Sequence, residues 1–255
     1  MPRPIFIGTP QPRGTAMRED TYIRRVRPDK HRLMPQTATP PALVRRGLCL
    51  VLSAPSGAGK TAITAALRAR APELRVSVSV TTRAPRPGEA QDVHYDFVTE
   101  EAFARMEGED KLLEWARVLA GTHAYGTPRA PVERTLAAGE DMVFDIDWQG
   151  HRALREKLPG DVVGVFILPP SLATLESRLR ARAGDEAAEI ARRMRLARDE
   201  ISHWREFDHV IVNDRLERAV DEVESVLRAA RLATARRTGL EHFIADLTSI
   251  ADLKA

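Results

Sequence analysis

The sequence is poor in the features that mark secreted, metal-bound and membrane-spanning proteins. Its one cysteine, Cys49, cannot form an internal disulfide, which is compatible with a reducing cytoplasm. The seven histidines show no zinc-like spacing. No apolar run approaches the roughly 18 residues of a membrane span, and the N-terminus lacks the apolar stretch of a secretory signal. We therefore expect a cytoplasmic protein with no membrane partner and no structural metal.

The net charge of +3 is unevenly distributed along the chain. Residues 1–46 hold ten Lys or Arg and three Asp or Glu, a charge of +7, which leaves −4 for residues 47–255. The same segment contains eight of the seventeen prolines and no sustained periodic pattern. This composition predicts a disordered basic extension. A basic arm is able to bind nucleic acid, but we favour an uncommitted tail, and no nucleic-acid partner is expected for the remainder.

Beyond residue 46, apolar runs of strand length alternate with helical patterns. The predicted strands cover residues 48–53, 75–81, 142–146, 162–168 and 209–212. The predicted helices cover residues 61–71, 129–138, 171–182, 187–204 and about 216–237. This alternation predicts an α/β fold with a mostly parallel sheet flanked by helices.

The turn after the first predicted strand matches the P-loop pattern, with Ala54 in place of the usual first glycine. Glycines let backbone N–H groups converge on phosphates, and the following helix adds its positive N-terminal dipole. Lys60 is placed to reach the β- and γ-phosphates, and the Thr61 hydroxyl to ligate Mg²⁺. The predicted phosphate-binding residues are Ala54, Pro55, Ser56, Gly57, Ala58, Gly59, Lys60 and Thr61. The pattern establishes a nucleoside triphosphate site without naming the acceptor.

A second basic stretch, at residues 79–89, contains Arg83 and Arg86 together with two prolines and a glycine. Two arginines three positions apart suit a bidentate grip on a phosphate dianion. Taken alone, the stretch is more typical of a solvated basic loop. Its meaning depends on the motifs that follow it.

Several further motifs occur in a fixed order after the P-loop. They are Ser-Val-Thr-Thr-Arg-Ala-Pro-Arg at 79–86, His-Tyr-Asp-Phe-Val at 94–98, Leu-Glu-Trp-Ala at 113–116, Tyr-Gly-Thr at 125–127, Asp-Ile-Asp-Trp-Gln-Gly at 145–150, Ile-Leu-Pro-Pro-Ser at 167–171 and Ile-Val-Asn-Asp at 211–214. In this order the sequence resembles the guanylate kinases over roughly residues 47–237. Many ordered motifs together are far more specific than any one of them. The resemblance implies a P-loop NTPase fold and the reaction ATP + GMP = ADP + GDP, with ATP and GMP as substrates and Mg²⁺ bound with ATP.

The resemblance also implies roles for individual residues. The GMP site comprises Ser79, Glu114, Thr127 and Asp147 around guanine, and Arg83, Arg86, Tyr95 and Tyr125 at the phosphate. On the ATP side, Arg178, Arg182 and Arg193 match lid arginines, and Asn213 matches a residue near adenine. The implied catalytic set is Lys60, Arg86, Asp145, Arg182 and Arg193. A solvated helix face remains the alternative for Arg178 and Arg193.

These motifs divide the chain into segments. Residues 47–240 form the catalytic domain, with a small GMP-binding subdomain at about 77–130 and a helical lid at about 178–195; residues 241–255 form a C-terminal tail. Two departures from the family pattern stand out: an alanine precedes Tyr125, and the lid reads Ala181-Arg182-Ala183-Gly184. Two alternatives stay open, a related kinase with another phosphate acceptor and a non-catalytic interaction module. The intact P-loop and the guanine-contacting set favour the enzyme.

Overall fold

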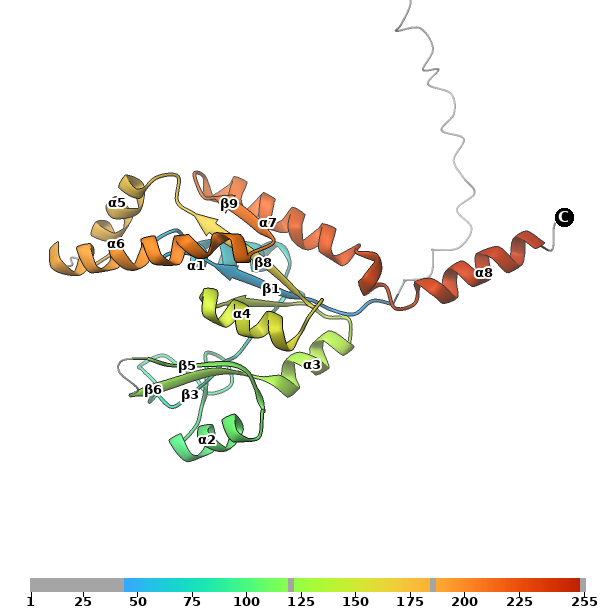
Figure 1. The fold of residues 1–255 in the computed structure, drawn as a ribbon, viewed down its shortest axis with the longest axis horizontal. Coiled ribbons are helices and arrows are strands. Elements are labelled where there is room, and N and C mark those ends of the chain that lie inside the picture. The colour runs from blue at the N-terminus through green and yellow to red at the C-terminus, as the bar shows by residue number, and fades with distance from the viewer. Residues whose placement is uncertain (1–43, 119–121, 184–186, 253–255) are drawn as a thin grey trace, which may run out of the picture. The chain divides into compact units, whose positions relative to one another are not determined.

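The computed structural model describes residues 44–118, 122–183 and 187–252. Helices and strands alternate along this part of the chain, so the predicted α/β fold is confirmed (Figure 1). The predictions for residues 1–43 lie outside the described residues. Among the described helices, none combines the length and the apolar character that crossing a bilayer requires.

The larger sheet has five parallel strands in the order β2-β7-β1-β8-β9. Their bounds are β1 (Cys49–Ser53), β2 (Arg75–Val76), β7 (Met142–Asp145), β8 (Val162–Leu168) and β9 (His209–Val212). Because the strands are parallel, their carboxyl ends meet at one edge, where β1 leads into the P-loop and β7 ends at Asp145. Candidate site residues that are distant in sequence thereby reach the same edge.

Both faces of this sheet are buried, which explains the continuous apolar runs of its strands. Leu50 and Leu52 belong to a core shared with α1 (Lys60–Arg70) and α7 (Leu216–Arg231). Cys49 and Val51 point to the other face and pack against a second core. That second core includes side chains of α3 (Arg129–Ala137) and α4 (Trp148–Lys157). Burying one Leu or Val side chain completely stabilises the fold by about 1.5–3 kcal/mol.

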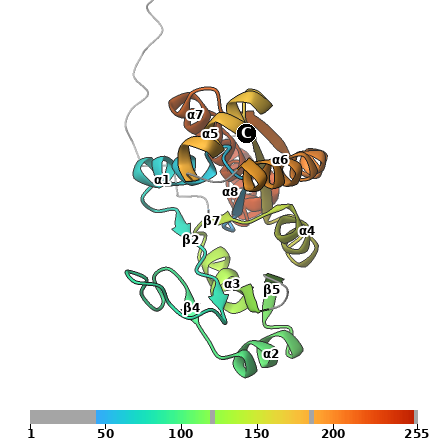
Figure 2. The same ribbon diagram turned by 90° about the vertical axis from the view of Figure 1, so that its left-hand side faces the viewer.

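A second, four-stranded sheet has the order β4-β3-β6-β5 and is mostly antiparallel. It consists of β3 (Val80–Thr81), β4 (Asp96–Phe97), β5 (Leu112–Val118) and β6 (His123–Pro128), with α2 (Glu100–Gly108) packed on it. Phe103 of α2 is fully buried against this sheet. Figures 1 and 2 show α3 and α4 between the two sheets.

The predicted strand at residues 75–81 was wrong as a single strand. Its first part is β2 in the larger sheet and its last part is β3 in the smaller sheet, so the segment joins the two. The N–H of Ser77 still bonds the carbonyl of Val143 at 3.1 Å, after which the chain leaves β7. Alternation of Val and Ser fits an extended segment equally well whether it stays in one sheet or crosses between two.

Two helices pack together beside the P-loop: α5 (Leu172–Ala183) and α6 (Ala187–Ser202). Leu175 and Leu179 of α5 are buried against Ala197 of α6. A short helix, η1 (His203–Glu206), follows α6, and η2 (Thr234–Arg236) follows α7. Most of the predicted tail, residues 241–252, lies in a helix, α8 (Leu240–Asp252).

The folded body includes two residues that were assigned to the basic extension. Arg45 donates to both oxygens of the buried Asp141 at 2.6 and 2.8 Å. Arg46 contacts Asp161 in the same bidentate manner, at 2.7–2.9 Å. A buried carboxylate requires such partners, so the boundary at residue 46 lies too late by at least these two residues.

Candidate active site

The turn between β1 and α1 has the geometry of a phosphate-binding loop. Gly57 and Gly59 have φ angles of 90° and 102°, in the left-handed region that glycine adopts without strain. A Cβ atom on Gly59 would lie 2.3 Å from Nδ2 of Asn213, so a side chain does not fit there. Ala54 has no positive φ and packs partly buried against the core. Alanine at the first position is therefore compatible with the loop.

Two side chains from distant elements brace this loop. The carbonyl of Ala58 accepts hydrogen bonds from Nδ2 of Asn213 at 2.8 Å and from Nη1 of Arg178 at 3.3 Å. Arg178 also donates from Nη2 to the carbonyl of Asn213 at 3.1 Å. These contacts restrain the loop backbone and link it to α5 and to the end of β9. The roles predicted for Arg178 at the ATP phosphates and for Asn213 near adenine remain predictions.

A cavity of about 320 Å³ lies between the loop and α5. It is lined by Gly57, Gly59, Thr61, Ala62, Arg178 and Ala181. Thr61, in the first turn of α1, is exposed. An anion beside this helix start meets unpaired N–H groups and the positive end of the helix dipole. The cavity thus has the chemistry for a triphosphate.

Lys60, the first residue of α1, is held at the carboxyl edge of the sheet. Its Nζ lies 2.5 Å from Oδ1 of Asp145 and donates to the carbonyl of Ile146 at 3.3 Å. The Lys60 side chain is 20% exposed and that of Asp145 is 41% exposed, so both are accessible from solvent. The pairing brings Asp145 and Lys60, two residues of the predicted catalytic set, into direct contact.

Arg83 is the centre of a cluster in the second sheet and is only 8% exposed. Its guanidinium donates to both oxygens of Glu89, each at 2.9 Å, and from Nε to the hydroxyl of Tyr125 at 3.1 Å. It also lies over the ring of Tyr95, 5.3 Å from the centroid. Three residues predicted at the GMP phosphate, Arg83, Tyr95 and Tyr125, are therefore brought together.

Glu89 is a residue of this site that the sequence interpretation missed. Besides Arg83, its carboxylate accepts from the backbone N–H of Arg86 at 2.8 Å. The hydrogen bonds from Arg83 and then Arg86 hold the pKa of Glu89 below its ordinary value. Glu89 thus closes the loop of residues 83–89 and leaves the exposed Arg86 side chain at its outer face. A sequence signal existed, since an acidic residue six positions after an arginine in a Pro- and Gly-rich loop suggests a local ion pair.

Three of the residues predicted around guanine lie on neighbouring elements: Glu114 in β5, Thr127 in β6 and Asp147 at the start of α4. The hydroxyl of the fully buried Thr127 donates to Oε1 of Glu114 at 2.6 Å. Burial raises the pKa of Glu114, against the effect of the Thr127 hydrogen bond, and the charge of Asp147 raises it further. Asp147 caps α4 by accepting from the N–H of Gly150 at 2.8 Å. Ser79 is partly buried in the segment before β3.

The predicted lid arginines lie on α5 and α6. Arg193 donates from Nε to Glu189 at 3.0 Å, and Arg192 with Arg193 lowers the pKa of Glu189 to about 2. Arg182 belongs to α5, but its side chain lies outside the described residues. Ala181 and Ala183 lie in the last turn of α5, because alanine favours the helix where the family pattern has glycine.

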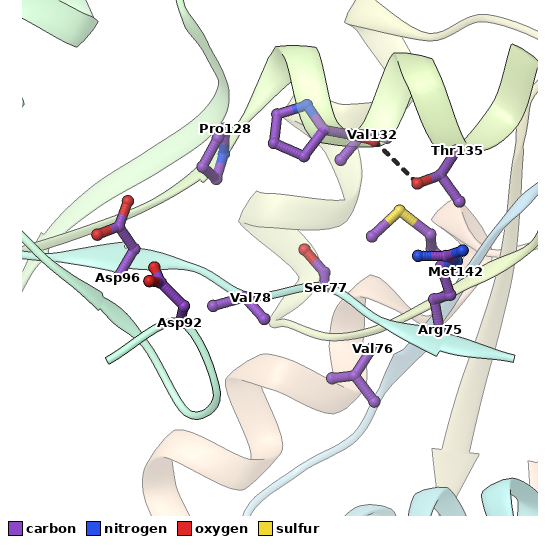
Figure 3. A pocket seen from close by; sticks show the side chains of 11 residues that line it. Arg75, Val76, Ser77, Val78, Asp92, Asp96, Pro128, Val132, Thr135 and Met142 are labelled. Atoms are coloured by element: carbon purple, nitrogen blue, oxygen red, sulfur yellow. Dashed lines mark hydrogen bonds between the residues drawn. The ribbon is translucent and has the colours of Figure 1, made fainter. Parts of the chain in front are cut away.

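A separate cavity of about 250 Å³ opens behind the segment that joins the two sheets (Figure 3). Figure 3 shows Ser77 and Val78 on one side of it and Val132 and Thr135 of α3 on the other. None of the predicted site residues lines it. It therefore belongs to the connection between the sheets and not to the candidate active site.

Comparisons with known proteins agree with this geometry. The guanylate kinase family profile matches residues 46–230. The chain belongs to the guanylate kinase family. It is 61% identical over 206 residues to the guanylate kinase of Gluconobacter oxydans, which covers 81% of this chain and 98% of that protein. The guanylate kinase of Rhodospirillum rubrum is 53% identical over 83% of this chain and 96% of its own length.

A solved structure supports the same assignment. The crystal structure of guanylate kinase from Anaplasma phagocytophilum has a TM-score of 0.64 and 34% sequence identity to this chain. It covers 80% of this chain and 96% of that one. Residues 1–45 and 231–255 lie outside the family profile.

Proposed function

We propose that this guanylate kinase transfers the terminal phosphoryl group of ATP to GMP. One observation carries the proposal: three consecutive residues join the two halves of the site. Asp145 and the carbonyl of Ile146 bind Lys60 of the P-loop. The charge of Asp147 raises the pKa of Glu114 in the second sheet. The end of β7 thereby connects the phosphoryl donor site at the P-loop with the acceptor site at the second sheet.

On the donor side, ATP binds with its phosphates against the P-loop N–H groups and Lys60. Thr61 is exposed at the start of α1, and Asp145 is an accessible carboxylate near Lys60. Hard oxygen groups such as these fit Mg²⁺, which prefers to be held by a few protein oxygens together with substrate phosphates. Thr61 would hold Mg²⁺, which would neutralise charge on the phosphates, and Asp145 would orient Lys60 or a water on the ion.

On the acceptor side, Arg83, Arg86, Tyr95 and Tyr125 hold the GMP phosphate. Guanine presents N1–H and a 2-amino group, and the two oxygens of Glu114 accept from both. Thr127 orients that carboxylate, and Ser79 and Asp147 complete the base site. Burial of Glu114 strengthens discrimination, because a base that lacks these donors would leave the carboxylate unpaired.

The chemistry needs alignment and charge neutralisation more than a general base. Lys60 and the lid residues Arg178, Arg182 and Arg193 stabilise negative charge on the transferred group. Arg86 holds the acceptor phosphate in line. Closure of α5 and α6 over the site would exclude water and limit hydrolysis of ATP.

The experiment that tests this function is a coupled assay of ADP release with GMP, AMP, CMP and UMP as acceptors. We expect turnover with GMP at least 10³-fold above the other three, on the scale that buried hydrogen-bond readout supports (about 10⁴–10⁵ in favourable cases). Equal rates with several acceptors would remove the guanine assignment, and no turnover with any would favour a non-catalytic module.

A further inference from the structure

Glu200 is an acidic residue that touches the P-loop from the lid helix. It lies in the last turn of α6, and its Oε2 accepts a hydrogen bond from the backbone N–H of Ser56 at 3.3 Å. Ser56 is the third residue of the P-loop, 144 positions away in sequence. A backbone N–H of this loop is a group that phosphate oxygens use. A carboxylate oxygen is chemically close to a phosphate oxygen as an acceptor.

The charged groups that affect Glu200 belong to both halves of the site. Burial raises its pKa, whereas the Ser56 N–H and Lys60 oppose this effect; the charges of Asp147 and Asp199 act with burial. Lys60 belongs to the donor side and Asp147 to the acceptor side. The hydrogen bond from Ser56 is the contact that holds the Glu200 carboxylate at the P-loop.

We propose that the Glu200 carboxylate and the terminal phosphate of ATP compete for the Ser56 N–H, so that ATP binds only as Glu200 moves away. Two anions do not share one N–H donor, and their mutual repulsion adds to the cost of having both nearby. The inference rests on the proposed binding of ATP at the P-loop. It adds to that function a residue of the chain that sets the affinity for the donor.

The exchange also bears on the lid. Arg193 lies seven residues before Glu200 on α6, which is about two helical turns and the same face. Ile201, in the last turn of α6, packs on the core of the larger sheet, whereas Ala197 packs on α5. Glu200 thus ties the base of the lid helix to the P-loop, and its displacement by ATP releases that tie on the face that carries Arg193. Glu200 is a positioning residue in this account, because its effect on transfer passes through the P-loop and α6.

The test is equilibrium binding of MgATP and MgADP, each without GMP, to the full chain and its variants by calorimetry. Glu200→Gln keeps the shape and removes the charge, and Glu200→Ala removes the acceptor as well. If Glu200 leaves Ser56 available about one-tenth of the time, Glu200→Ala binds MgATP about tenfold more tightly than the parent. Glu200→Gln should tighten MgATP by a smaller factor. MgADP, which lacks the γ-phosphate, should change by less than about twofold.

Asp199→Asn is the matched control. Asp199 is an exposed carboxylate one residue away on α6, so its replacement removes the same charge without touching Ser56. MgATP binding by Asp199→Asn should equal that of the parent. A general effect of charge would tighten binding in this variant too, and that would overturn the specific contact. Unchanged or weaker MgATP binding in both Glu200 variants, with thermal unfolding like that of the parent, would also overturn it.

Failure of this inference is distinguishable from failure of the proposed function. Lys60→Ala should weaken MgATP binding if the P-loop is the donor site. Normal MgATP binding by Lys60→Ala would reject the P-loop assignment. Weakened binding in Lys60→Ala, together with no tightening in the Glu200 variants, would reject only the competition at Ser56.

Discussion

The two candidate phosphate sites of this protein differ in the groups that form them. The P-loop relies on backbone: Gly57 and Gly59 take positive φ angles, and Asn213 braces the carbonyl of Ala58. The loop of residues 83–89 relies on side chains, because the guanidinium of Arg83 is fixed by Glu89 and Tyr125. A carboxylate contacts each of them, Glu89 from within the same loop and Glu200 from a distant helix.

The difference concerns how each site tolerates substitution. A site formed by backbone groups needs residues that permit a conformation, and alanine permits the one at position 54, where φ is not positive. A site formed by side chains needs specific donors at specific distances. Arg83 donates to Glu89 and Tyr125 at the same time, and no other residue type has donors in that arrangement. We expect variants of the two sites to fail in different kinetic parameters.

The largest effect is expected from Lys60→Ala on the P-loop side. This change removes a positioned charge at the transferred group, and kcat should fall at least about 10³-fold, or about 4 kcal/mol. The fold should persist, because Lys60 is accessible and pairs with the exposed Asp145. The coupled assay and a thermal melt measure both quantities. Near-normal turnover in the folded variant would contradict the catalytic role.

The next largest effect is expected from Glu114→Gln, which should alter the choice of base. An amide accepts at one oxygen where the carboxylate accepts at two, so kcat/KM for GMP should fall about 100-fold and discrimination against AMP should narrow. The assay compares GMP with AMP in parent and variant. A lower melting temperature at constant selectivity would instead show that Glu114 serves only to hold Thr127 and the strand.

Glu89→Gln should have an intermediate effect confined to the acceptor. Without the charged partner, Arg83 loses its bidentate ion pair, and we expect KM for GMP to rise about tenfold while KM for ATP stays within twofold. Glu109→Gln, an exposed carboxylate beside Lys111, is the control and should leave both KM values unchanged. An equal rise in KM for ATP would break the separation between the two sites.

A smaller effect concerns stability and lies outside both phosphate sites. His151 is 1% exposed, stacks on Phe207, and neither ring nitrogen has a hydrogen-bond partner among the described residues. Burial lowers its pKa from 6.5 to about 4. Between these values the unfolded chain binds a proton that the folded chain does not, so stability falls as the pH decreases through this window.

The melting temperature from pH 7 to pH 5 measures this contribution. His151→Phe keeps a ring on Phe207 and does not titrate, so it should lose about 5 °C less than the parent over this range. His242→Gln, which replaces a histidine with a side chain 87% exposed, should retain the pH dependence of the parent. Identical pH dependence in His151→Phe and the parent would show that His151 is not the group responsible.

The smallest effect is expected from deletion of residues 1–41. These residues precede the first core strand, and both phosphate sites are formed by residues after 53. We expect the KM values for ATP and GMP to stay within twofold of those of the full chain. Complete loss of activity in a folded, truncated protein would assign the extension a structural or catalytic role.

The sequence predicted the first sheet better than the second. The strands β1, β7, β8 and β9 are apolar runs because both faces are covered, and such runs are visible without knowing their partners. The strands β3 and β4 are two residues long and owe their existence to neighbours far along the chain. The helix α4 also escaped prediction, since Gly150 and His151 interrupt its apolar face.

Within the candidate site, the sequence pattern predicts the residues of the P-loop, but it does not predict which distant residues contact them. The turn at the start of α1 depends on local backbone conformation at Gly57 and Gly59, just before Lys60. Those residue types are therefore visible in the sequence itself. Contacts such as Glu200 with Ser56 or Arg83 with Tyr125 join residues 144 and 42 positions apart. Only packing of the helices and strands brings those atoms within hydrogen-bond distance, because a contact of a few ångströms depends on the placement of whole elements and leaves no periodicity in the chain.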